Sequence, residues 1–105
     1  MSEGGQGAGI LPYSPGVDLL RAVCTRDGIR VNARLASPGQ ADLVVFDAQG
    51  RAVRRLYQGW LDAGTRDFTW DCRHESGCPV AAGTYFIRLS TGGRTATARV
   101  SVIGR

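Results

Sequence analysis

The sequence of 105 residues contains no lysine, a single histidine and a single methionine. All 13 basic side chains are therefore arginine, and with 9 acidic residues they give a net charge of +4. The basic residues are spread along the chain among the acids, whereas nucleic-acid binders gather theirs on one face. A mixed-charge surface is the simpler interpretation, and nucleic acid is not the expected partner.

Long apolar runs are also missing. No stretch approaches the roughly 20 apolar residues that a membrane-spanning helix needs, so no transmembrane segment is predicted. The first residues, Met1 to Gly5, have neither the basic nor the apolar region of a secretory signal. We therefore expect the cytoplasm, or the cytoplasmic face of a membrane complex, with export by a non-classical route as the alternative.

Catalytic signatures are absent as well. The sequence has no phosphate-binding loop, dinucleotide fingerprint or paired carboxylates, so we expect no cofactor. The only cluster suited to chemistry is DCRHESGC, from Asp71 to Cys78. This polar loop places a cysteine near a histidine but supplies no third group to orient them. The sequence therefore predicts no enzyme activity.

The cysteines of this loop leave three interpretations open. A disulfide between Cys72 and Cys78 would close a hairpin loop and stabilise the fold by about 2 kcal/mol. A metal site would combine both cysteines with His74, although the spacing is not a recognised zinc pattern. Asp71 or Cys24 would then be the fourth ligand. Reduced thiols without a role are the third interpretation, and the redox compartment decides between the first and the last.

Glycine, in contrast, is abundant: its 15 residues are about twice the average share. Abundant glycine favours many tight turns and therefore many short strands. Between the turns, apolar residues alternate with polar ones, as in half-buried strands. The predicted strands are residues 17–24, 29–35, 41–46, 51–57, 65–71, 85–89 and 95–102, the first with a short helix as its alternative.

Seven strands at this spacing predict an all-β protein, an immunoglobulin-like or fibronectin III-like antiparallel β-sandwich over residues 17–105. Residues 1–16 are rich in Gly, Ser and Pro, and they predict an extended N-terminal arm. Val53 and Leu56 differ in strand parity, so we expect a bulge between them, at the Arg54–Arg55 pair. The expected core contains Trp70, Tyr85, Ile87, Val31, Val45, Val100 and Val102.

Four motifs follow one another along the chain: VFDxxGRxVRxL from Val45, GxLxAG from Gly59, WD at Trp70 and GxxVxxGxY from Gly77. This series resembles the Ig-like domain of flagellar hook-capping proteins and the C-terminal sorting domains of bacterial type IX secretion. The resemblance covers roughly Ile29 to Val102 and implies the sandwich fold. It departs from the family at Cys72, where members usually have glycine.

The sequence favours a non-catalytic structural or accessory subunit of a larger protein assembly, either membrane-associated or filamentous. Such a subunit would dock through its N-terminal arm and an edge strand. Ile10, Leu11 and Tyr13 are the only sizeable apolar residues of the arm, and we expect them to anchor it to a partner. A secretion or sorting domain is an alternative that the resemblance implies.

A second alternative is a carbohydrate- or ligand-binding module. Its binding platform would consist of the exposed rings of Trp60, Tyr57 and Phe86. Trp60 and Leu61 either close the end of the core or lie exposed, and we expect them to close it, because single aromatics at sandwich corners usually do so.

Overall fold

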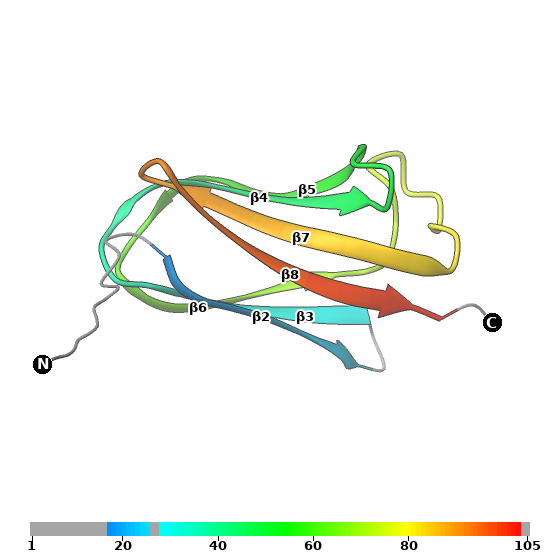
Figure 1. The fold of residues 1–105 in the computed structure, drawn as a ribbon, viewed down its shortest axis with the longest axis horizontal. Coiled ribbons are helices and arrows are strands. Elements are labelled where there is room, and N and C mark those ends of the chain that lie inside the picture. Colours follow the sequence, from blue (N-terminus) through cyan, green and yellow to red (C-terminus); the bar gives the residue numbers. More distant parts are fainter. Residues whose placement is uncertain (1–16, 26–27, 104–105) are drawn as a thin grey trace, which may run out of the picture.

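The computed structural model describes residues 17–25 and 28–103, and in these it contains seven strands and no helix (Figure 1). This confirms the predicted all-β sandwich. The predicted arm, residues 1–16, lies outside the described residues. No helix in the described ranges is long and apolar enough to cross a membrane. The strands are β2 (Val17–Thr25), β3 (Gly28–Leu35), β4 (Gly39–Asp47), β5 (Ala52–Leu61), β6 (Gly64–Trp70), β7 (Gly83–Thr91) and β8 (Arg94–Val102).

The strands form two antiparallel sheets that pack face to face. The first sheet has the order β2-β3-β6 and the second has the order β5-β4-β7-β8. The chain passes from the second sheet to the first between β5 and β6. On the opposite side of the sandwich, β2 lies against β8, and the Cys24 thiol donates to the carbonyl oxygen of Ser101 at 3.5 Å.

The core is centred on two aromatic rings. Trp70 is fully buried, and its ring meets that of Tyr85 edge-on with the centroids 5.4 Å apart. The Trp70 indole N–H donates to the carbonyl oxygen of Arg73 at 2.9 Å, and the Tyr85 hydroxyl donates to that of Ala81 at 2.6 Å. Both rings therefore enter the core without leaving a polar atom unsatisfied. Around them, Val31, Val45, Ile87 and Val100 are buried, and Val102 is half-buried at the margin.

Irregular pairing in β5 corrects one prediction. The pairing of β5 with β4 skips Val53 and Leu56, so two bulges flank the Arg54–Arg55 pair and neither lies at it. Val53 is buried and Leu56 packs against the core. Two residues three positions apart cannot face the same side of a regular strand, and the bulges make this possible.

Trp60 corrects another prediction. Its side chain is 55% exposed, whereas that of the next residue, Leu61, is fully buried. Successive side chains of a strand point to opposite faces, so only one of the two closes the core. The indole N–H of Trp60 instead donates to the carboxylate of Asp62 at 3.2 Å.

Candidate functional site

The loop between β6 and β7, residues 71–82, contains the cluster that the sequence marks for chemistry. In it, the Val80 amide donates to the Cys72 carbonyl oxygen at 3.0 Å, and the His74 amide donates to the Cys78 carbonyl oxygen at 2.8 Å. Cys72 is thus opposite Val80, and Cys78 is opposite His74. All three cysteines lie in the described residues and none forms a disulfide, so the predicted Cys72–Cys78 bridge is not present.

The ligands proposed for a metal site are not gathered either. In the part of the chain that the structure describes, no group of three or more His, Cys, Asp or Glu side chains is placed to hold a metal ion. Asp71 accepts hydrogen bonds from the Arg54 side chain at 3.0 Å and from the Arg73 amide at 3.2 Å, which is a structural role. Cys72 lines a hollow of about 850 Å³ together with Cys24 at the end of the sandwich, and Cys78 does not line it.

The backbone at Cys72 is in the left-handed region, with φ of 62°. Among the described residues, Cys72 is the only residue other than glycine with a positive φ. For a residue with a Cβ this conformation costs roughly 1–2 kcal/mol. This strain gives a physical reason for the glycine that the resemblance implies at this position.

We expect Cys72→Gly to change the free energy of unfolding by less than about 1 kcal/mol, because relief of strain offsets the lost packing of a half-buried side chain. Cys72→Val should have a free energy of unfolding about 2 kcal/mol lower than that of Cys72→Gly, since a β-branched residue is least compatible with this backbone conformation. Urea denaturation of both variants measures the difference. Equal stability of the valine and glycine variants would contradict the assigned backbone conformation.

The turn between β4 and β5 depends on Asp47. Its carboxylate accepts from the amides of Gln49 and Arg51, both at 2.9 Å, and from the Arg51 side chain at 3.0 Å. The backbone hydrogen bond from Arg51 is the largest cause that lowers the pKa of Asp47. Burial, conversely, raises the pKa of Tyr85 above its usual value. The hydrogen bonds of Asp47 therefore hold the turn, and the raised pKa of Tyr85 reflects the burial of its ring in the core.

Glu75 covers the bulged part of β5, an edge strand of the sandwich. Its amide donates to the Val53 carbonyl oxygen at 3.1 Å, and its carboxylate accepts from the Arg55 amide at 2.7 Å. The β6–β7 loop thereby occupies backbone groups on the free side of β5, where the bulges lie. Covering and bulging are two ways in which natural sheets block an edge strand. The sequence analysis did not single out Glu75, because no local pattern indicates a contact between positions 20 residues apart.

The edge of β6 is different. This strand pairs with β3 alone, and no backbone hydrogen bond of the described residues reaches its other side. The side chains of Thr65, Asp67 and Thr69 are exposed. Since β2 and β8 lie against each other and Glu75 covers the bulged part of β5, β6 offers the more open edge of the sandwich in the described residues.

Aromatic rings lie beside this open edge. Tyr57 of β5 and Phe68 of β6 are half-buried, with their centroids 5.4 Å apart. The guanidinium carbon of Arg66 lies 5.9 Å from the first ring and 5.8 Å from the second. Arg66 is the cross-strand partner of the buried Ala33, so it is an inward-pointing charge on an edge strand, a feature that opposes indiscriminate strand pairing.

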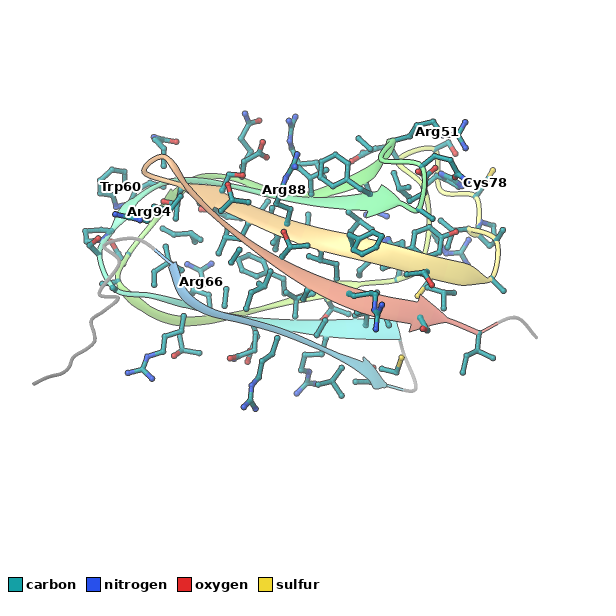
Figure 2. All side chains as sticks on the ribbon, viewed as in Figure 1. Arg51, Trp60, Arg66, Cys78, Arg88 and Arg94 are labelled. Atoms are coloured by element: carbon teal, nitrogen blue, oxygen red, sulfur yellow. The ribbon has the colours of Figure 1, made fainter. Side chains whose placement is uncertain are left out.

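The platform required for ligand binding does not form. The ring of Tyr57 contacts Phe68 between the sheets. Trp60 pairs with Gln40 near one end of β4. Phe86 pairs with Phe46, which lies six positions after Gln40 on β4 and therefore about 20 Å from it. Figure 2 shows Trp60 at the end of the molecule opposite to Cys78. The rings therefore do not present one surface to a sugar or another flat ligand.

Comparison with known proteins gives a family match and similar solved structures. The family model of the FlgD Ig-like domain matches residues 22–94. The crystal structure of FlgD from P. aeruginosa is similar over 84% of this chain and 74% of that chain, with 25% identity and a TM-score of 0.59. PorZ, an essential bacterial surface component of the type IX secretion system of Porphyromonas gingivalis, is 27% identical over 74% of this chain, with a TM-score of 0.48.

The matched region spans only 10% of PorZ, and a search of curated protein sequences found no match. The family match covers well over half of the chain and includes β3 to β7 entirely. It confirms the resemblance that the sequence motifs indicated. The chain therefore belongs to the family of FlgD Ig-like domains.

Proposed function

We propose that the chain is a non-catalytic structural module that docks into a larger protein assembly through the open edge of β6 and through its N-terminal arm. The observation that carries this proposal is the contrast between the edges. Glu75 covers the bulged part of β5, and β2 and β8 lie against each other, whereas no backbone group of β6 is occupied on its free side in the described residues.

The roles of the motif residues support a structural function. Trp70 and Tyr85 form the centre of the core, Asp47 closes a turn, and Asp71 connects the β6–β7 loop to β5. Each of these four motif residues is thus explained by folding. Membership in a family whose domain occurs in flagellar hook-capping proteins favours another protein as the partner.

The geometry of β6 suits the addition of a strand. An extended segment of a partner would form main-chain hydrogen bonds with the free side of β6, and its alternate side chains would reach the neighbouring rings. Tyr57 and Phe68 supply the apolar contact next to that edge. Arg66 would select against partners that place a positive charge there.

The arm would supply a second contact. Ile10, Leu11 and Tyr13 lie outside the described residues and remain its proposed anchors. Two linked contacts bind more tightly than either one alone, because the second contact forms at a high effective concentration. Loss of the arm should therefore weaken docking without removing the contact at β6.

Site-specific photocrosslinking in the native cells tests both contacts. A photoreactive residue in place of Thr65, at the β6 edge, should give a discrete protein adduct. The same residue in place of Thr95, which is exposed on β8, is the matched control and should give none. Deletion of residues 1–13 should lower the yield from position 65 by about tenfold or more, within the range of avidity effects.

The outcomes separate the two contacts. Adducts of equal yield from positions 65 and 95, or none from either, would contradict docking at β6. An unchanged yield after the deletion would contradict a role for the arm. Thermal unfolding of each variant, followed by circular dichroism, must first show that the sandwich is intact.

A further inference from the structure

The outer face of the sheet β2-β3-β6 carries an uneven distribution of charge. Cross-strand partners share a face, and on this side they form rows: Arg21 with Asn32 and Asp67, and Val23 with Arg30 and Thr69. The intervening residues of β3 are buried, so these side chains point away from the core. We name this surface, formed by the two rows, the basic face.

On the other sheet, the arginines at and beside β5 form ion pairs, whereas Arg94 and Arg99 of β8 form none among the described residues. Arg51 pairs with Asp47 at 3.0 Å, and Arg55 pairs with Asp42 at 2.9 Å. Figure 2 shows Arg51 and Arg88 on that side of the sandwich. The guanidinium carbon of Arg88 lies 4.3 Å from the ring centroid of Phe46 on the neighbouring strand β4.

The basic face lacks such compensation. Arg21 and Arg30 are exposed, and within the described residues neither forms an ion pair. Within the two rows, Asp67 is the only acidic side chain. Its carboxylate accepts a hydrogen bond from the Asn32 amide group at 2.7 Å. Two guanidinium groups therefore remain available to an anionic partner.

An apolar group accompanies these charges. Val23 is 58% exposed and is the direct cross-strand neighbour of Arg30. Arginine beside exposed apolar surface is typical of protein–protein interfaces. A nucleic acid would gain nothing from Val23, and its phosphates would be repelled by Asp67. The composition of the face therefore favours a protein.

We infer that the basic face binds an acidic protein surface, whose carboxylates pair with Arg21 and Arg30 while an apolar side chain covers Val23. Guanidinium groups pair with carboxylates in a bidentate geometry, which supplies orientation as well as attraction. The inference rests on the proposed function, because β6 contributes both its open edge and part of the basic face. A partner that adds a strand to β6 would meet Arg30 on the neighbouring β3 first, and would have to extend about 10 Å from β6 to reach Arg21 and Val23 on β2.

Charge reversal in the crosslinking experiment tests this inference. A photoreactive residue in place of Thr69, which is next to Arg30, would be introduced into the unaltered chain and into the double variant Arg21→Glu and Arg30→Glu. The matched control is Arg94→Glu with Arg99→Glu, which makes the same change in net charge at exposed positions of β8. Thermal unfolding checks that both double variants are folded.

We expect an adduct in the unaltered chain, a loss of about tenfold or more in the first double variant, and little change in the control, since interfacial charge pairs act locally. Acidic residues should surround the crosslinked position of the partner, as identified by mass spectrometry. Equal yields in the two double variants would overturn the inference while leaving docking at β6 intact. An adduct destroyed by nuclease would overturn it in favour of nucleic acid, and no adduct in the unaltered chain would overturn docking as well.

Discussion

Replacement of Trp70 by alanine is expected to lower the free energy of unfolding by about 3–5 kcal/mol, a large part of the stability of a small domain. The side chain is fully buried, and its removal leaves a cavity against the ring of Tyr85. It also removes the indole donor from the carbonyl oxygen of Arg73, which loses its hydrogen bond at the start of the β6–β7 loop. Urea denaturation followed by circular dichroism measures the change.

The chain supplies its own control for this substitution. Trp60→Ala removes the same number of atoms from a side chain that is 55% exposed. Its only hydrogen bond among the described side chains is to Asp62, so we expect a loss below about 1 kcal/mol. A Trp70 variant no less stable than the Trp60 variant would contradict the position of Trp70 at the centre of the sandwich.

The strands could be predicted from the sequence because one face of each is buried. Alternation along β3 and β8 is sufficient to place their apolar residues inward, and the glycine-rich turns mark where each strand ends. Where alternation is ambiguous, prediction fails. Trp60 and Leu61 are both large and apolar, and only the pairing of β5 with β4 decides which of them points inward.

The candidate docking surface depends on pairing that no local pattern reveals. Arg21 and Arg30 come from different strands, and they share a face only because Arg21 pairs with Asn32 and Arg30 with Val23. In the sequence these arginines are simply two members of a dispersed set. The open edge of β6 is equally hidden, since it follows from the pairing of β6 with β3 alone.

The hairpin loop of residues 71–82 shows a further limit of sequence reasoning. Cys72 and Cys78 bracket the loop, and this spacing made a bridge between them a reasonable prediction. The backbone hydrogen bonds set a register in which each cysteine is opposite a different residue. Register, and not separation along the chain, decides whether two side chains in a hairpin meet.

Gly28→Ala is expected to destabilise the fold by about 3 kcal/mol or more, because two separate costs combine at this position. The backbone has φ of 140°, a conformation that costs a residue with a Cβ about 1–3 kcal/mol. A Cβ there would overlap the carbonyl oxygen of Trp70 and lie 3.3 Å from the Cα atom of Asp71. Both neighbours are backbone, so no side chain can rotate to make room, and overpacking of this kind costs about 1–3 kcal/mol more.

Gly64→Ala separates the two costs. Gly64 has φ of 117°, but a Cβ at this position would meet no atom within 4 Å. The substitution should therefore show the cost of strained backbone alone, about 1–3 kcal/mol. The difference between the two variants in urea denaturation reports the steric overlap between β3 and the carbonyl group that ends β6. If Gly28→Ala proves no more damaging than Gly64→Ala, the close approach of these two strands at Trp70 is wrong, and with it the register that aligns the two rows of the basic face.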